Sequence, residues 1–310
     1  DLKANANPII LSHIQQAGLG ADCVSGGEVQ RAIESGFPAQ QIVYAGVGKS
    51  DREIQLALQH DILCFNVESI PELQVINEIA AQQNQVARVC LRINPDVAAH
   101  THQFIATGKA ENKFGIAYAD MMEVIQIASH LEHIQLIGLH FHIGSQITDM
   151  NDYIHLCERI NTIQSMLEEQ SIHLSLINVG GGLGVDYENP QMNAIPDFNT
   201  YFNVFAQYLQ LRPNQSLHFE LGRSVVAQCG SLIAQVLYVK QTPTKRFVIL
   251  DAGMTELIRP ALYQAKHKID NLSSTSPIIE RYDVVGPICE SSDVFAKDIL
   301  LPTTKRGDII

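Results

Sequence analysis

Lys3 is the first residue whose surroundings could support chemistry. It lies in the sequence Lys-Ala-Asn, at the end of a short stretch that we expect to be a strand. A lysine amine that points into an enclosed site is desolvated, which lowers its pKa and suits it to form a Schiff base. A solvated surface lysine is the commoner case, so Lys3 gains meaning only together with other residues.

The sequence His-Phe-His-Ile-Gly-Ser contains two histidines, His140 and His142, followed by Ser145. Because strand side chains alternate between two faces, the two rings should share a face. The pair could bind a metal ion, or one ring could form an aromatic platform beside the serine hydroxyl. A structural histidine explains each ring alone, and a metal-dependent hydrolase would need further ligands at later strand ends. His218 should face as Glu220 does, and no complete ligand set is found.

Glycines and charged residues follow the late strands. Consecutive glycines at 180–182 allow positive φ angles and let backbone N–H groups converge on an anion. The tract matches neither the P-loop nor the dinucleotide-binding pattern, so it does not imply a nucleotide. Glu220 could accept a hydrogen bond from a protonated ring nitrogen, and Arg223 could bind a phosphate or carboxylate. A buried Glu220–Arg223 ion pair is the alternative interpretation.

Two further clusters lie nearer the C-terminal end. Arg259 and Tyr263 are four residues apart, so on a helix the cation and the phenol would lie one turn apart. Cys289 and Glu290 place a thiol beside a carboxylate at the expected end of a strand. Since a cysteine is usually an inert core residue, the thiol alone indicates nothing.

The elements that must position these residues alternate along the first 227 residues. Short apolar runs rich in β-branched residues are separated by segments with helical apolar spacing. Eight such strands predict a parallel sheet closed into a (β/α)8 barrel, with an open doubly wound sheet as the alternative. The strands are expected at 1–4, 20–25, 42–46, 63–67, 87–93, 136–143, 176–179 and 217–220.

The pattern changes beyond residue 227. Segments 231–240, 246–251 and 283–289 are typical of strands, with one short helical stretch near 255–263. We therefore expect a barrel domain at 1–227 and a mainly β domain at 228–310. In a barrel of this kind the site lies where strands end, and the loops after the seventh and eighth strands usually bind phosphate.

Composition restricts the partners. The 310 residues include 33 acidic and 21 basic ones, which gives a formal net charge of −12. This charge argues against a nucleic acid or an anionic membrane surface as partner, because both bind basic surfaces. The six cysteines are scattered without a Cys-x-x-Cys pair, which disfavours a disulfide scaffold or a zinc ribbon and favours the reducing cytoplasm.

In combination, the clusters resemble the fold-type III pyridoxal-phosphate decarboxylases, which share their barrel with alanine racemase. The resemblance rests on the order Lys-Ala-Asn, His-Ile-Gly-Ser, Gly-Gly-Gly, Glu-x-Gly-Arg and Cys-Glu-Ser, and it covers the whole chain. Arg-Pro-Ala-Leu-Tyr at 259–263 and Gly-Pro-Ile-Cys-Glu-Ser at 286–291 are more similar to members that decarboxylate diaminopimelate than to those that decarboxylate ornithine.

The resemblance implies pyridoxal 5'-phosphate as cofactor, joined to Lys3 through a Schiff base. His142 should stack on the cofactor ring, and Glu220 should pair with the ring nitrogen. Ser145, the glycine turn and Arg223 should hold the phosphate. The cofactor-binding residues implied are Lys3, His142, Ser145, Gly181, Gly182, Glu220, Leu221, Gly222 and Arg223.

The implied reaction converts meso-2,6-diaminopimelate to L-lysine and CO2, the last step of lysine biosynthesis. Arg223, Arg259 and Tyr263 would bind the distal carboxylate of the substrate, and Glu290 its distal ammonium. Cys289, supplied by the other subunit of a homodimer, would donate the proton that replaces CO2. The catalytic residues implied are Lys3, Glu220 and Cys289.

Two alternatives remain within the same fold. The substrate could be another diamine-type amino acid, such as ornithine, lysine or carboxynorspermidine. A catalytically dead regulatory homologue would be expected to have lost Lys3, Glu220 or Cys289, and all three remain. The family usually has proline where Leu221 stands, and it carries an N-terminal segment and a C-terminal stretch with a cofactor-contacting tyrosine that these 310 residues do not include.

Overall fold

The structure is a computed structural model that describes residues 1–96 and 113–310. Its contacts divide the chain into two compact units. The first comprises Asp1–Gly184 and Pro196–Ala227, and the second comprises Val185–Ile195 and Gln228–Ile310. The division expected from the sequence assigns all of 1–227 to one domain, whereas the short segment Val185–Ile195 makes its contacts with the second unit.

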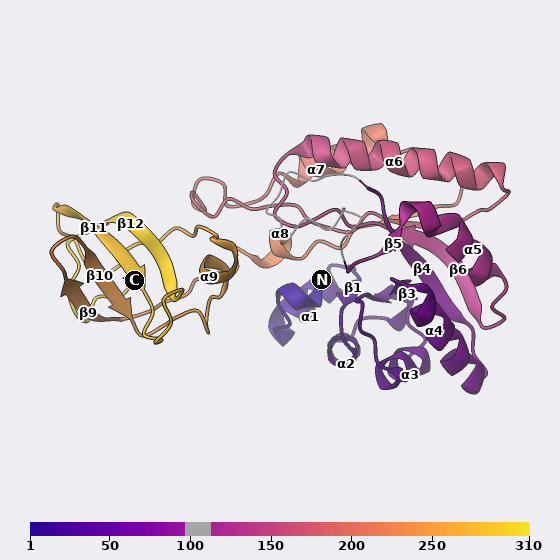
Figure 1. The fold of residues 1–310 in the computed structure, drawn as a ribbon, viewed down its shortest axis with the longest axis horizontal. Helices are drawn as coiled ribbons and strands as arrows, with labels where there is room; N and C mark the ends of the chain where they lie inside the picture. The colour runs from indigo at the N-terminus through magenta and orange to yellow at the C-terminus, as the bar shows by residue number, and fades with distance from the viewer. Residues whose placement is uncertain (97–112) are drawn as a thin grey trace. The chain divides into compact units, whose positions relative to one another are not determined.

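Strands and helices alternate along the first unit (Figure 1), and neighbouring strands pair in parallel, which confirms the α/β class. Its strands are β1 (Ala21–Cys23), β2 (Ile42–Tyr44), β3 (Cys64–Val67), β4 (Ala87–Asn94), β5 (Ile116–Ala117), β6 (Ile134–His140), β7 (Leu176–Asn178) and β8 (Ser216–His218). Its α-helices are α1 (Pro8–Gln16), α2 (Gly26–Glu34), α3 (Asp51–Gln59), α4 (Ile70–Gln82), α5 (Met121–Ser129), α6 (Met150–Glu169), α7 (Phe198–Tyr208) and α8 (Arg223–Val226). Short 3-10 helices are η1 (Leu2–Ala4), η2 (Ala39–Gln41) and η3 (Tyr118–Asp120).

A repeated sequence feature starts three of these helices. Each begins after a serine that is followed three residues later by glutamate, at Ser25, Ser50 and Ser69. The hydroxyl oxygens of Ser25 and Ser69 accept from a backbone N–H of the first turn, whereas the Ser50 hydroxyl donates to the Glu53 carboxylate. In all three helices the glutamate carboxylate accepts from a backbone N–H at the helix start. These caps fix where α2, α3 and α4 begin, so the loops after β1, β2 and β3 are short and end at one edge of the sheet.

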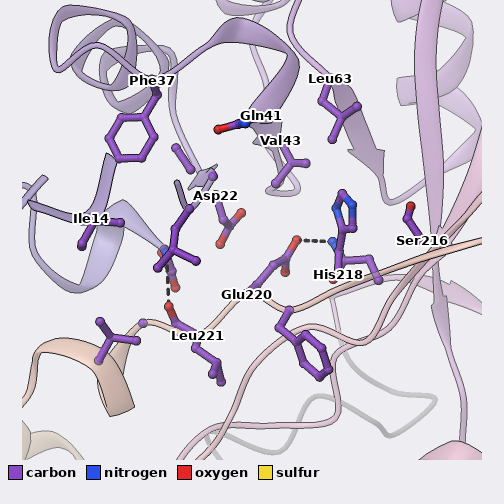
Figure 2. A pocket seen from close by; sticks show the side chains of 18 of the residues that line it. Ile14, Asp22, Phe37, Gln41, Val43, Leu63, Ser216, His218, Glu220 and Leu221 are labelled. Carbon is purple, nitrogen blue, oxygen red and sulfur yellow. Dashed lines mark hydrogen bonds between the residues drawn. The ribbon is translucent and has the colours of Figure 1, made fainter. Parts of the chain in front are cut away.

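The order of the sheet runs from β1 to β8. The turn at residues 2–4 contacts β1, and Asp1 bonds to the segment that follows β8. Leu2 is buried in the core, and the Asp1 amine donates to the Leu221 carbonyl at 3.4 Å, the bond that reaches Leu221 in Figure 2. The predicted strand at 1–4 is wrong. Leu2–Ala4 form the 3-10 turn η1, because the Asp1 carboxylate accepts from the Lys3 N–H and the Asp1 carbonyl accepts from the Ala4 N–H at 3.2 Å.

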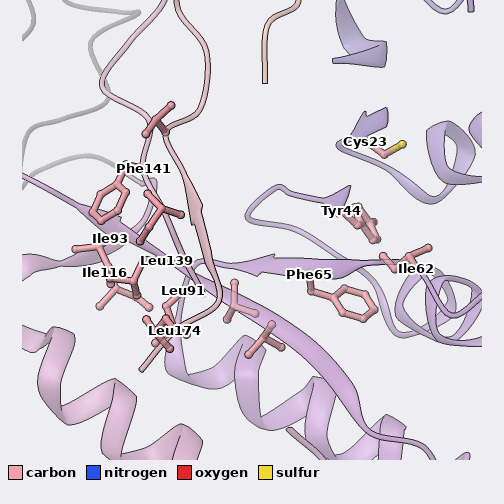
Figure 3. Close-up of a cluster of buried hydrophobic side chains, with 14 of the residues drawn as sticks. Cys23, Tyr44, Ile62, Phe65, Leu91, Ile93, Ile116, Leu139, Phe141 and Leu174 are labelled. Atoms are coloured by element: carbon pink, nitrogen blue, oxygen red, sulfur yellow. The ribbon is translucent and has the colours of Figure 1, made fainter. Parts of the chain in front are cut away.

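Side chains of the parallel strands alternate between two environments. Those that face the helices form the main apolar core, for example Phe65, Leu91 and Leu139 (Figure 3). Those on the other face meet across the sheet. Asn66 on β3 bonds to Glu220 just beyond β8, although several strands separate β3 from β8 in the sheet order. The sheet must therefore curl round an interior, as the predicted barrel requires.

The interior has an apolar layer and a polar layer. Val43, Cys64, Cys90 and Leu176 form a small buried cluster of their own, separate from the main core. At the next inward position, two residues farther along a strand toward its carboxyl end, the side chains are polar and buried. They are Asp22, Asn66, Arg92, His140 and Asn178. The polar layer lies toward the carboxyl ends of the strands, which is where such sheets place their sites.

The second unit is built on a four-stranded sheet, which confirms its mainly β character. Its core contains Val236, Val248, Tyr282 and Val284. The sheet order is β12 (Val294–Pro302), β11 (Ile279–Val285), β10 (Arg246–Leu250) and β9 (Val236–Gln241), and the helix α9 spans Arg259–Tyr263.

Two sequence expectations for this unit need correction. The strand expected at 283–289 is β11, which ends at Val285, because Gly286 and Pro287 follow and proline has no N–H for a ladder. Strand β12 was not expected, since charged residues interrupt its apolar pattern. Within residues 1–96 and 113–310, none of the helices combines the length and the apolar character that a bilayer crossing requires.

Candidate active site

The centre of the polar layer is the carboxylate of Glu220. Its Oε1 accepts hydrogen bonds from the side-chain amides of Asn66 at 2.8 Å and Asn178 at 2.7 Å. Its Oε2 lies 2.9 Å from Nε2 of His140, which can donate to it. Three strands, β3, β6 and β7, thus supply one donor each to a single buried carboxylate.

These donors determine the ionisation state of Glu220. Burial alone would raise its pKa, but the charge and hydrogen bond of His140 and the amide of Asn178 outweigh burial, so the pKa falls below the usual range of a carboxyl group. A carboxylate that stays ionised at neutral pH can keep a nearby ring nitrogen protonated. The pairing of Glu220 with the cofactor nitrogen remains a prediction, and the geometry gives the carboxylate the charge that this role needs.

The two histidines have different surroundings. His140 bonds to Glu220, whereas Nδ1 of His142 accepts from the backbone N–H of Gly181 at 3.3 Å. Burial, then the charge of Arg92, lowers the pKa of His142 to about 3, so its ring is neutral. A neutral, buried imidazole suits an aromatic platform. Among the described residues no three His, Cys, Asp or Glu side chains gather as a metal site would require, so the metal alternative gains no support.

The glycine turn is shaped by close backbone contacts. Gly180 and Gly182 have φ angles of 69° and 104°, in the left-handed region that favours glycine. A Cβ on Gly181 would lie 2.3 Å from the Glu220 carbonyl oxygen, and one on Gly182 would lie 2.5 Å from that of Gly144. Side chains at these positions are thus excluded, and the backbone of the turn lies against the segments that carry Glu220 and Ser145.

The turn faces the residues expected to bind phosphate. The Arg223 guanidinium donates to the Ser145 hydroxyl at 3.2 Å, although Arg223 begins α8 and Ser145 lies in the loop after β6. Gly222 also packs closely, since a Cβ there would lie 2.9 Å from that of Asp1. Leu221, at the family's usual proline position, packs against the core and offers its carbonyl to the Asp1 amine. A guanidinium, a hydroxyl and a side-chain-free turn form a donor set that fits a phosphate group.

Lys3 lies beside this site on η1, which contacts β1. Its side chain is 65% exposed, and its amine forms an ion pair with the Asp1 carboxylate at 3.3 Å. The desolvated amine expected from the sequence is therefore not present in this conformation. The positive charge of Lys3 nevertheless acts on Asp22 and on His142, lowering the pKa of each, so the residue lies near the polar layer.

Several residues of this layer were not singled out from the sequence. Asn66, Asn178 and Asp22 are buried, and so is Arg92, which forms an ion pair with Glu68 at 3.0 Å. For Asp22, Asn66 and Asn178 the sequence carries a signal, because each is a polar residue in a short and otherwise apolar strand. Such residues have inward positions in a barrel, and a buried polar side chain is rarely kept without a partner.

In the second unit, Arg259 begins α9 and Tyr263 ends it, as the spacing predicted. The Arg259 guanidinium stacks on the ring of Tyr187 at 4.3 Å from its centroid. One of its nitrogens lies 2.9 Å from Nε2 of His267. Tyr187 belongs to the short segment that joins the second unit, so this segment helps to orient the arginine.

The loop after β11 carries Cys289 and Glu290, and both side chains are exposed. Cys289 is a loop residue rather than the end of a strand. The side chain of Asp293 fixes this loop and is only 3% exposed. It accepts hydrogen bonds from the backbone N–H groups of Ile288 at 2.9 Å and Met254 at 2.7 Å. Asp293 thus fixes the loop and leaves the thiol and the carboxylate at the surface.

Known proteins match this chain over its whole length. The model of the pyridoxal binding domain of pyridoxal-dependent decarboxylases matches residues 1–227. A diaminopimelate decarboxylase of Bacteroides thetaiotaomicron is 62% identical over 309 residues, which cover 100% of this chain and 80% of that protein.

Solved structures agree. The crystal structure of a diaminopimelate decarboxylase variant from Helicobacter pylori, complexed with L-lysine, superimposes with a TM-score of 0.92 at 44% identity, covering 99% of this chain and 76% of the other. A lysine/ornithine decarboxylase of Vibrio vulnificus, complexed with putrescine, has a TM-score of 0.81 at 22% identity, covers 99% of this chain and 78% of its own, and shows likeness of fold alone.

Proposed function

The chain belongs to the pyridoxal-dependent decarboxylases, and we propose that it removes CO2 from meso-2,6-diaminopimelate to give L-lysine. The observation that carries this proposal is the buried, triply hydrogen-bonded Glu220, in a chain that is 62% identical to a diaminopimelate decarboxylase. Decarboxylation of an amino acid needs an acceptor for the electron pair of the broken bond. Pyridoxal 5'-phosphate supplies that acceptor when it is bound.

The residues of the first unit fit this cofactor. We assign its phosphate to Ser145, the backbone of Gly181, Gly182 and Gly222, and the Arg223 guanidinium. We assign the face of its ring to His142, whose neutral state suits stacking. Leu221 would complete the pocket through its backbone.

Each catalytic residue has one task in this proposal. Glu220 keeps the ring nitrogen protonated, which strengthens the cofactor as an electron acceptor. Lys3 binds the cofactor covalently through its amine, and the flexible side chain can turn from its exposed position to reach it. Cys289 donates the proton that takes the place of CO2. Its exposure on a loop fits a group that works in a site completed by another surface.

Specificity would come from the distal end of the substrate. Arg223, Arg259 and Tyr263 would bind the distal carboxylate, and Glu290 the distal ammonium. A substrate without these groups would leave charged partners unpaired, at a cost of about 1–3 kcal/mol for each. Ornithine has no distal carboxylate, so its turnover should be far slower.

The direct test is a measurement of CO2 and lysine release from purified protein. Treatment with borohydride should fix the cofactor to Lys3, and mass mapping of the adduct to another lysine would disprove this attachment. Hydroxylamine, which captures the aldehyde cofactor, should abolish activity, whereas chelators should have no effect. Loss of activity to a chelator, restored by zinc, would instead support the metal alternative.

We also propose a homodimer with shared active sites, in which Cys289 of one subunit serves Lys3 of the other. Lys3→Ala and Cys289→Ala homodimers should each be nearly inactive on meso-diaminopimelate. Mixing them under subunit exchange should restore about a quarter of wild-type activity, because about half of the dimers are mixed and each has one intact site. No recovery despite proven exchange would mean that the two residues act within one chain.

The remaining features of the proposal concern location and partners. We propose a cytoplasmic enzyme without nucleic acid or membrane partners. The net charge of −12 and the six scattered cysteines support this view. Fractionation of the cell of origin, followed by activity measurement in each fraction, tests it.

A further inference from the structure

We propose that Asp22 is a positioning residue, whose carboxyl group binds the amine of Lys3 inside the barrel and shares a proton with it. The inference rests on the proposed attachment of the cofactor to Lys3. It adds a residue that neither the sequence motifs nor the proposed mechanism uses. Its basis is a buried carboxyl group with one oxygen that lacks a hydrogen-bond partner, in a cavity that is also lined by Asp1 and Leu2, the two residues before the lysine.

Asp22 is the middle residue of β1, and its neighbours in the strand face the other way. Ala21 and Cys23 pack in the main apolar core, so alternation turns Asp22 to the interior. It is 8% exposed. Its side chain lines a cavity of about 1060 Å³ that Glu220 also lines, and Figure 2 shows both carboxylates pointing into the same space.

One oxygen of this carboxyl group lacks a bond. Oδ1 of Asp22 is buried and has no hydrogen-bond partner among the described residues. Leaving a buried polar atom unsatisfied costs about 1–3 kcal/mol, and more if the group is charged. An unbonded oxygen in a cavity next to functional residues indicates that a side chain or a ligand enters the cavity and binds it.

The charges around Asp22 indicate which partner it needs. Burial, then the negative charge of Glu220, raises the pKa of Asp22 to about 8, and Glu28 acts in the same direction. Glu220 has three donors of its own and stays ionised, so Asp22 must take up a proton or a cation. The charges of the Asp1 amine and then of Lys3 lower the pKa of Asp22, and of these two cations only Lys3 is carried by a long side chain that can turn inward.

Two buried cationic side chains, Arg92 and Lys49, already form ion pairs with other carboxylates. Arg92 pairs with Glu68 at 3.0 Å, and Lys49 pairs with Glu72 at 2.6 Å. Lys3, by contrast, is largely exposed and sits on η1, which contacts β1 directly. Its four-carbon side chain can turn inward at little cost, because the amine is largely exposed and its ion pair with Asp1 is therefore weak.

The proton balance then follows. While the lysine is outside, Asp22 holds a proton. When the Lys3 ammonium turns inward, Asp22 releases its proton to solvent, which leaves a carboxylate beside an ammonium. When Lys3 is joined to the cofactor, the same carboxylate stabilises the positive charge on the linking nitrogen and so raises the pKa of that nitrogen.

The test is a spectrophotometric pH titration of the holoenzyme, in which the absorbance of the bound cofactor reports the charge on the linking nitrogen. In Asp22→Asn the pKa of this nitrogen should fall by about 1 to 3 pH units, the usual effect of an opposite charge nearby. Asp22→Glu should restore most of the wild-type value. The control is Asp120→Asn, at an exposed acid whose side chain makes no cap bond to α5, which should titrate as wild type.

Mass mapping after borohydride treatment separates the two proposals. Attachment at Lys3 in both proteins, with the same pKa in wild type and Asp22→Asn, would overturn the role of Asp22 and leave the proposed function intact. Attachment at another lysine would overturn both. If Asp22→Asn fails to fold, Asp22→Ser decides, because a small neutral side chain also removes the negative charge and should lower the pKa of the linking nitrogen, whereas loss of a purely structural residue should leave this pKa unchanged.

Discussion

Glu220 and Cys289 are both proposed to be catalytic, yet their surroundings differ completely. Glu220 is buried and receives hydrogen bonds from three strands of its own unit. Cys289 is exposed on a loop, and the residue that fixes the loop, Asp293, bonds to its backbone rather than to the thiol. The carboxylate of Glu220 is held by hydrogen bonds within its own unit, whereas the thiol of Cys289 is exposed at the surface of its unit.

The difference shows that a catalytic group that must stay charged and one that must reach a substrate need different surroundings. A charge that must stay ionised needs fixed donors before the reaction, and these can come only from neighbouring elements of a packed interior. A proton donor must reach a substrate, so it needs a rigid loop and an open side. Changes at the two places should therefore have different effects on stability and activity.

The largest effect is expected from Glu220→Gln. The neutral amide cannot hold the ring nitrogen in its protonated form, so kcat should fall by about 1000-fold, near the upper effect of losing one preorganised electrostatic group. Steady-state kinetics with meso-diaminopimelate measures this. The exposed Glu123→Gln is the matched control and should be unaffected. Turnover near wild type in Glu220→Gln would show that catalysis does not need the charge of this buried carboxylate.

Cys289→Ala should lower kcat by about 100-fold, the lower range for loss of a general acid. Because the thiol is exposed, its Tm should stay within about 1 °C of wild type, since exposed substitutions change stability little. Cys229→Ala, at the other exposed cysteine, is the control for both measurements. A large fall in Tm would show that Cys289 has a structural role instead.

Asp293→Asn should act on the loop. The amide keeps one acceptor oxygen, so one of the two backbone bonds is lost and the second unit should be destabilised by about 1–2 kcal/mol. Activity should fall about tenfold because Cys289 and Glu290 are less well positioned. Denaturant unfolding and kinetics together test this. Unchanged activity with lowered stability would mean that the loop adapts when substrate binds.

The smallest effect concerns pH. Since the pKa of Glu220 is lowered on folding, its carboxylate stabilises the fold above its unfolded pKa, and this contribution is lost as pH falls through the lower folded pKa. In Glu220→Gln the new N–H group would face donors, which should cost about 1–2 kcal/mol at pH 7. The difference from wild type should shrink at pH 3.5. A difference that grows on acidification would contradict the sign of the shift.

The sequence determined much of this molecule. Apolar runs of the right length predicted β1 to β4 and β6 to β8 of the parallel sheet but not the two-residue β5, and the order of short motifs indicated the family. It also indicated the glycine turn, because consecutive glycines are needed where backbone segments meet closely. These features are local, so they can be read from neighbouring residues.

Other features were decided by tertiary structure. The sequence marks Asn66, Asn178 and Asp22 only as polar residues in apolar strands. Their shared site forms only when the sheet curls and brings β1, β3 and β7 around Glu220. The predicted strand at 1–4 failed for a similar reason: a strand needs partners, whereas the Asp1 side chain closes a turn with its own neighbours. Spacing along the chain reports hydrogen bonds within a few residues. Bonds between distant strands depend on the closure of the whole sheet.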